Sequence, residues 1–403
     1  MLFERRGLLL ALAARGSERL HRRSETDTAH GMRRALWASA ILFASACSGS
    51  DVLPDPDRDL GGAPGPDASG LPDASEPDFG EFDAGAAPDL SRPDAGFADP
   101  AAIDIGRQNI DGLETFVHVR GVLDPASPPI VLIGEGPAVG FDYMIDPFEF
   151  LLGSGGADNP ERLLIFMDIA GQGRSEEGST QRPEVSVENG ITSLVNALEH
   201  FRDAYDERAP DIVAQGYGAM VAAVVGSRRP ELVNRLVLIT PYPTNLPQRG
   251  RWLTDIQVTL SSGDRTFISS LTSDPACRND PEDCARDIFK TYAKHWVCFE
   301  TRDAFDELTF DFVNPVGAFS IEGALRRPPP DGFSVVADVE ALRAPTTVIV
   351  GACDYLPETT IGTYTSSTGA ARVELPDAGH WPMVESPAAF QQAVFDGLYG
   401  PIP

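Results

Sequence analysis

An α/β fold, in which helices cover both faces of a mostly parallel sheet, is the class that this sequence predicts. Short apolar runs that end in glycine or polar residues alternate with segments whose apolar residues recur at helical spacing. Strands that alternate with helices in this way are typical of parallel sheets. The chain has 403 residues and is 42% hydrophobic, which is enough for one large core with additional segments.

The expected strands follow one another from residue 103 onward. Ile103–Ile110 and Thr115–Val119 flank Asp111-Gly112, a dipeptide that favours a hairpin. Further strands are expected at 129–133, 163–167, 212–214, 236–239, 347–350 and 372–375. Helices are expected at 190–205, 217–227 and 388–398, between and after these strands.

The interval 242–335 interrupts this alternation. It is polar, contains three cysteines and ends near the run Pro328-Pro329-Pro330. The helical spacing of Ile288, Tyr292 and Trp296 favours a folded insertion over a disordered loop. We therefore expect a core made of residues 101–241 and 336–403, with 242–335 as a cap over the carboxyl edge of its sheet.

Charge is unevenly distributed along the chain. Lys and Arg total 32 and Asp and Glu total 60, which gives a formal net charge of −28. A chain this acidic is not expected to bind nucleic acid through a general basic field. No apolar stretch reaches the roughly 18 residues that a membrane-spanning helix needs.

The first 47 residues resemble a leader for export. Met32-Arg33-Arg34 precedes an apolar run that ends in Ala44-Ser45-Ala46-Cys47, the pattern of a secretory signal. The last four residues resemble a bacterial lipobox, which implies that Cys47 receives lipid and anchors the protein to a membrane. Met32 is then the expected true start, and the expected location is the outer membrane or the periplasmic side of the envelope. An uncleaved anchor and an ordinary signal are the alternatives.

Residues 48–100 are expected to form a disordered tether. Thirteen acidic residues face two Arg, and Pro-Asp occurs seven times. Proline removes hydrogen-bond donors, the acids repel one another, and apolar residues are too sparse to offset the chain entropy. A cation-binding acidic repeat is the alternative, but the spacing lacks the glycine pattern of calcium repeats.

Four stretches resemble the α/β-hydrolase superfamily, and in particular the proline iminopeptidase group of serine aminopeptidases. Gly134-Glu135-Gly136-Pro137-Ala138 is similar to the His-Gly-Gly-Pro-Gly loop of that group, and 168–175 is similar to its Asp-x-Arg-Gly-x-Gly-x-Ser turn. The segment 214–218 stands where the nucleophile elbow belongs. Asp354 and His380 match the positions of the acid and the base, so the resemblance implies an α/β-hydrolase fold.

The residue that should attack a substrate is missing from this set. In G-x-S-x-G the serine falls on Gly216, which has no side chain. Ala214 also replaces the first glycine of that motif, and Gly134 replaces the histidine of the loop before it. Asp354 and His380 are then a vestigial acid and base. The resemblance implies an oxyanion hole formed by the N–H of Tyr217 and one from the loop at Glu135 and Gly136.

Three substitutes for the missing serine need to be considered. Tyr217 is adjacent, but on this turn its side chain should point elsewhere, and its ordinary pKa of about 10 does not help. A Cys353 thiolate near His380 is a second possibility, and a water activated by His380 is a third. No metal spacing is seen at His118, His200 or His295, and neither a metal nor another cofactor is expected.

The chain has five cysteines, and the four that remain beside Cys47 permit two disulfides in an exported protein. Cys277 and Cys284 are close in sequence and are the preferred pair. Cys298 with Cys353 would join the cap to the core.

The sequence thus predicts a cell-envelope lipoprotein with a hydrolase fold that has lost hydrolysis and is kept to bind a ligand or protein partner. Two alternatives stay open. One is an active aminopeptidase or esterase with an unconventional nucleophile or a His380-activated water, and the other is a purely structural surface domain.

Overall fold

We analysed a computed structural model of the chain, which describes residues 103–110, 113–124, 127–153, 161–175, 186–204, 208–278, 281–314, 321, 325, 333–366 and 370–401. The expected leader, the lipidation site at Cys47 and the expected tether lie outside the described residues.

The described residues form one sheet of eight strands in the order β1-β2-β4-β3-β5-β6-β7-β8. The strands are β1 (Ile103–Ile110), β2 (Leu113–Gly121), β3 (Ile130–Ile133), β4 (Leu163–Asp168), β5 (Asp211–Gln215), β6 (Arg235–Ile239), β7 (Thr346–Gly351) and β8 (Ala371–Leu375). β1 pairs with β2 and β2 with β4 in antiparallel fashion, and the other neighbours are parallel. The predicted strands and the hairpin at the start are confirmed.

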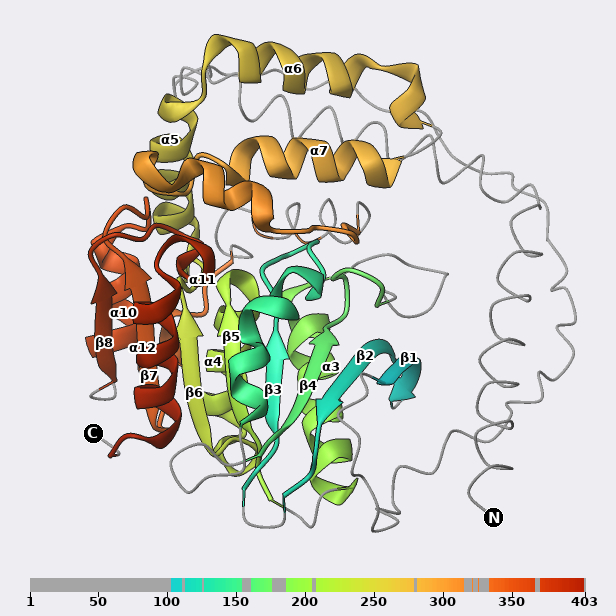
Figure 1. Cartoon of the computed structure of the whole chain (residues 1–403), viewed down its shortest axis with the longest axis vertical. Helices are drawn as coiled ribbons and strands as arrows, with labels where there is room; N and C mark the ends of the chain where they lie inside the picture. Colours follow the sequence, from blue (N-terminus) through green and yellow to red (C-terminus); the bar gives the residue numbers. More distant parts are fainter. Residues whose placement is uncertain are drawn as a thin grey trace, which may run out of the picture.

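Helices cover both faces of this sheet (Figure 1). On one face lie α3 (Val187–Ala204), α4 (Gly216–Arg228), α9 (Val336–Glu340) and α10 (Glu358–Ser366), and on the other lie η2 (Asp146–Leu152) and α12 (Pro387–Tyr399). β3 and β4 are buried on both faces, because helices exclude water from both sides of a parallel sheet. The predicted fold class is therefore confirmed.

The helical segment formed by the described residues between β6 and α9 lies over the carboxyl ends of the parallel strands (Figure 1). It contains α5 (Leu246–Thr259), α6 (Ser262–Ser273), η4 (Pro275–Arg278), α7 (Pro281–Ala293) and η5 (Phe299–Glu307). We call this segment the cap. Helix α7 ends at Ala293, so Trp296, the last residue of the helical spacing seen in the sequence, lies in the turn that follows.

The turn after β4 holds the loop that follows β3. The Asp168 carboxylate accepts hydrogen bonds from the N–H groups of Phe141 and Arg174, each at 2.9 Å. The Ser175 hydroxyl donates to the carbonyl of Asp168 and accepts from the N–H of Phe116. The amide nitrogen of Gln172 donates to the carbonyl of Gly134 at 3.2 Å. The turn has an architectural role, because it fixes the loop that begins at Gly134.

Candidate active site

The candidate site begins at the sharp turn between β5 and α4. Gln215 ends the strand and Gly216 begins the helix, with a φ of +51° at Gly216. This left-handed backbone is the strained strand-to-helix turn on which the fold carries its nucleophile. Gly216 therefore has the backbone of a nucleophile elbow without a side chain to react.

The Glu135 carboxylate fills the space that a side chain at Gly216 would need. A Cβ atom built on Gly216 would lie 1.6 Å from Glu135 Oε2 and 2.1 Å from its Cδ, far inside van der Waals contact. Glu135 follows β3, and none of its surface is exposed. A side chain at position 216 and this arrangement of Glu135 exclude each other.

His380 lies between two carboxylates. Its Nδ1 is 2.8 Å from Asp354 Oδ2, and its Nε2 is 3.0 Å from Glu135 Oε2. Asp354 follows β7 and His380 precedes α11 (Pro382–Glu385), so three separate loops supply the three side chains. Both nitrogens of an imidazolium are donors, which matches an acceptor on each side.

The His380 imidazole is held in its protonated form. Burial alone would lower its pKa, but the charge of Asp354 and the hydrogen bonds to Asp354 and Glu135 outweigh that effect and raise the pKa to about 10. An imidazolium at neutral pH has no free lone pair, so it cannot take a proton from water. The site as it stands contains a proton donor where a serine hydrolase needs a base.

The expected oxyanion donors are only partly available. The N–H of Glu135 donates to the Tyr143 hydroxyl at 2.6 Å, and that hydroxyl donates to Gln215 Oε1 at 2.8 Å. The N–H of Glu135 is therefore already paired within the fold, so of the two expected loop residues only Gly136 could offer its N–H to an oxyanion. Gly136 and Tyr217 do lie close together, since a Cβ on Gly136 would be 3.0 Å from Tyr217 Cδ1.

Neither side chain considered as a substitute nucleophile is available. The Tyr217 hydroxyl lies towards α3, where a Cβ on Gly190 would be 3.3 Å from it, and burial raises the pKa of this tyrosine. The Cys353 sulfur is bonded to Cys298, so the Cys353-thiolate alternative is wrong. The sequence pointed only to the backbone of Glu135, whereas its side chain is the group at Nε2 of His380.

Two disulfides join cysteines within the described residues. Cys277 and Cys284 are joined within the cap at an S–S distance of 2.00 Å, and Cys298 and Cys353 join the cap to the core at 2.06 Å. These are the two pairings that the sequence analysis considered. Cys353 immediately precedes Asp354, so the second bond attaches the cap to the loop that carries the acid.

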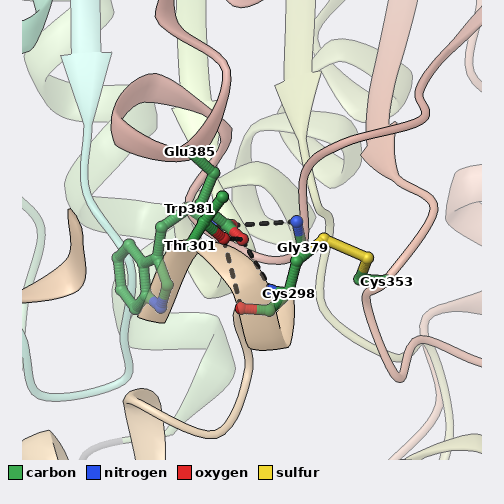
Figure 2. The surroundings of a disulfide bond; sticks show 6 residues. All are labelled: Cys298, Thr301, Cys353, Gly379, Trp381 and Glu385. Carbon is green, nitrogen blue, oxygen red and sulfur yellow. Dashed lines mark hydrogen bonds between the residues drawn. A yellow bond between two sulfur atoms is a disulfide. The ribbon is translucent and has the colours of Figure 1, made fainter. Parts of the chain in front are cut away.

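A buried carboxylate ties the same part of the cap to the loop of His380 (Figure 2). Glu385 Oε1 accepts from the N–H of Cys298 at 2.7 Å and from the Thr301 hydroxyl at 2.8 Å. Its Oε2 accepts from the N–H groups of Gly379 and Trp381, at 2.9 and 3.0 Å. Glu385 therefore fixes the backbone on both sides of His380.

Tryptophan side chains surround the imidazole. The ring centroids of Trp296, Trp381 and Trp252 lie 5.0, 5.4 and 6.0 Å from that of His380. Their indole nitrogens are buried and have no hydrogen-bond partner within the described part of the chain, and the same holds for Glu135 Oε1. The site therefore combines apolar walls with several unused polar atoms.

No group of three His, Cys, Asp or Glu side chains that could hold a metal is found among the described residues. His295, one of the histidines considered in the sequence, is 3.0 Å from Asp264. No helix in the described ranges is long and apolar enough to cross a membrane.

Comparisons with known proteins identify relatives of this fold. The family described as "Alpha/beta hydrolase family" matches residues 136–393. No curated protein matches the chain.

Three crystal structures illustrate the structural likeness. VinJ is 20% identical, with 74% of this chain and 98% of that chain covered and a TM-score of 0.51. The proline iminopeptidase of Mycobacterium smegmatis is 16% identical, with 74% and 98% covered and a TM-score of 0.50. The proline iminopeptidase-related protein of Thermus thermophilus is 18% identical, with 75% and 99% covered and a TM-score of 0.51. At these identities the likeness shows the fold alone.

The charge on His380 makes a prediction for the pH dependence of stability. A pKa raised to about 10 in the folded state, from an ordinary value of about 6.5, stabilises the fold most below pH 6.5 and less as the pH rises towards 10. The difference in free energy of unfolding between wild type and His380→Gln should therefore be largest near pH 6 and shrink by pH 10. Urea unfolding across this range measures it, with the exposed His200→Gln as the matched control. A difference that grows with pH would contradict a protonated His380.

The two disulfides predict unequal effects of their removal. Cys298 and Cys353 are 55 residues apart and Cys277 and Cys284 only 7, so loop-closure entropy gives about 4 and about 2 kcal/mol respectively. Only the double variant Cys298→Ser with Cys353→Ser should also shift the NMR titration of His380, because Cys353 adjoins Asp354. The variant Cys277→Ser with Cys284→Ser is the control. An unchanged His380 titration in both variants would show that the cap does not hold the site.

Proposed function

Because the chain belongs to the α/β-hydrolase family, we propose that it is an exported lipoprotein whose hydrolase domain has lost serine-type hydrolysis. In this proposal the capped site is retained to bind a ligand or a partner. The domain is held away from the membrane by the Pro-Asp-rich segment 48–100 and anchored through a lipid on Cys47.

One observation supports the loss of serine chemistry above all others: the Glu135 carboxylate occupies the space above Gly216. Removing the nucleophilic serine of a triad costs roughly 10⁶-fold in turnover. In addition to the missing serine hydroxyl, the Glu135 side chain fills the space above Gly216 and hydrogen bonds to His380. Prolyl peptides and acyl esters, which a proline iminopeptidase-like enzyme would attack through serine, are therefore not expected to be substrates.

The alternative of an active hydrolase takes two forms, and the structure favours one of them. A water activated by His380 requires a neutral imidazole, whereas the two flanking carboxylates keep His380 protonated. An unconventional nucleophile remains in the form of Glu135, which is the reactive side chain beside His380.

The overlap between Glu135 and a side chain at position 216 predicts that one substitution cannot install a serine nucleophile. Gly216→Ser alone should remain unlabelled by a fluorophosphonate probe and should destabilise the fold by about 1–3 kcal/mol, because the new side chain overlaps Glu135. Adding Glu135→Gly removes the overlap and frees Nε2 of His380, so the double variant should regain stability and some labelling. The two substitutions should therefore be strongly non-additive in a double-mutant cycle.

The matched control is Gly250→Ser, where a Cβ meets nothing within 4 Å. Probe labelling of the wild-type chain, or release of fluorophore from a prolyl substrate that disappears in His380→Ala, would contradict the proposal. Additive effects of the two substitutions on stability would contradict the steric explanation.

Lipid attachment at Cys47 makes a separate prediction. In a bacterial host, a radiolabelled fatty acid should mark the wild-type protein, and Cys47→Ala should remove the label and release the protein from the membrane fraction. The variant Cys277→Ala with Cys284→Ala is the control and should keep the label. Equal labelling of wild type and Cys47→Ala would disprove the anchor.

A further inference from the structure

Gln215 lies at the centre of the candidate site, although its side chain carries no reactive group. It is the last residue of β5 and directly precedes Gly216. None of its surface is exposed, and its side-chain amide makes two hydrogen bonds, each to a different loop of the site. A buried amide has to pair its polar atoms, so its partners show which parts of the chain it holds together.

The amide connects the loop of Glu135 to the loop of His380. Gln215 Oε1 accepts from the Tyr143 hydroxyl at 2.8 Å, and that hydroxyl accepts from the N–H of Glu135 at 2.6 Å. On the other side, Gln215 Nε2 donates to the carbonyl of His380 at 2.8 Å. Because Nε2 of His380 lies 3.0 Å from Glu135 Oε2, these contacts form a closed ring of four residues: Glu135, Tyr143, Gln215 and His380.

We propose that Gln215 is a positioning residue, which holds the Glu135 carboxylate against the His380 imidazole through this ring of hydrogen bonds. The inference goes beyond the proposed function, because it concerns what keeps the two side chains together and is the same whether the capped site binds a small molecule or a protein. It assigns a role to the residue before the elbow, a place for which the motif G-x-S-x-G specifies no residue type.

The chemistry of the partners fixes the direction of each hydrogen bond that Gln215 depends on. A backbone carbonyl can only accept, so the amide nitrogen of Gln215 has to face the carbonyl of His380. The amide oxygen then faces Tyr143, whose hydroxyl has to donate to it. The backbone N–H of Glu135 can only donate, and it uses a lone pair of the same hydroxyl. Only a side chain with one donor and one acceptor at this length completes the ring, which selects glutamine over glutamate or leucine.

Burial keeps Tyr143 in the form that the ring requires. Its pKa is raised well above the ordinary value by burial and, to a smaller extent, by the charge of Glu135, so the hydroxyl keeps the proton that it donates to Gln215. The aromatic ring of Tyr143 packs against those of Phe310 and Trp381, with centroid distances of 5.4 and 5.3 Å. These contacts fix the place of the hydroxyl between Glu135 and Gln215.

A strained residue supplies a second donor to the same carbonyl. Thr240 follows β6 and has a φ of +41°, a left-handed backbone that is unfavourable for a β-branched side chain. Its hydroxyl donates to the carbonyl of His380 at 3.3 Å, and its N–H donates to the carbonyl of Ile349 at 2.8 Å. Strain of this kind persists where surrounding contacts over-determine the backbone, and it clusters at functional sites. Side chains from the ends of two neighbouring strands therefore hold the carbonyl of His380.

The test measures the pKa of His380 by NMR of the ¹⁵N-labelled imidazole, whose signal is identified by its absence in His380→Gln. Burial lowers this pKa, whereas Asp354 and the hydrogen bond to Glu135 raise it, so loosening the contact with Glu135 should lower the measured value. Gln215→Met keeps the size of the side chain and removes both of its hydrogen bonds, and it should lower the pKa of His380 by about one pH unit. Tyr143→Phe, which removes a single hydroxyl, should lower it as well.

The ring also predicts how these two substitutions combine. Since either one opens the same ring, the double variant should lower the pKa of His380 no further than Gln215→Met alone. The matched control is Gln248→Met, because Gln248 joins α5 to α10 through hydrogen bonds to Thr359 and Thr363 and lies outside the ring. It should lose stability and leave the pKa of His380 unchanged.

Three results would overturn the positioning role of Gln215. The first is a pKa of His380 that stays at the wild-type value in either Gln215→Met or Tyr143→Phe. The second is additive shifts in the double variant, which would come from separate contacts rather than from one ring. The third is an equal shift in Gln248→Met, which would assign the effect to a general loosening of the fold. Labelling by the fluorophosphonate probe tests the proposed function independently of these measurements.

Discussion

The contact between the Glu135 carboxylate and the His380 imidazole determines the state of the whole site. It is possible only because Gly216 has no side chain, since even a single added carbon would overlap the carboxylate. It also sets the charge of the imidazole, because two buried carboxylates on opposite nitrogens outweigh the cost of burying a cation. The same contact therefore requires glycine at position 216 and sets the protonation state of the His380 imidazole.

Contacts between the cap and the loops of His380 and Asp354 hold this pair of side chains in place. Glu385 uses both of its oxygens to hold backbone N–H groups from the cap and from the loop of His380. The Cys298–Cys353 disulfide attaches the same stretch of the cap to the loop of Asp354 (Figure 2). In addition, the N–H of His380 donates to the carbonyl of Trp296 at 2.7 Å. The cap is therefore part of the scaffold of the site, in addition to covering it.

Most of the fold could be predicted from the sequence because its strands are short apolar runs, and burial on both faces demands such runs wherever the sheet is parallel. The approach of His380 to Asp354 could be predicted because both follow the carboxyl ends of strands. Helix α10 could not, since Glu358–Ser366 is rich in threonine and lacks a clear apolar stripe. Its position depends on packing against its neighbour α9.

The role of Glu135 was missed for a different reason. The sequence showed a charged residue where the resemblance implies glycine, and a glycine where it implies serine, but these two departures lie on different loops. Only the folded backbone shows that one side chain enters the volume vacated by the other. A large residue in one motif that accompanies a lost side chain in another is the signal that could have revealed it.

The backbone at Gly216 also constrains how this site can be altered. A serine at the elbow leaves no room for a glutamate in the present position of Glu135. A single codon change that placed serine at position 216 would therefore produce a clash rather than a hydrolase site. The two loops can accept such a change only together, which couples two positions that are 81 residues apart in the sequence.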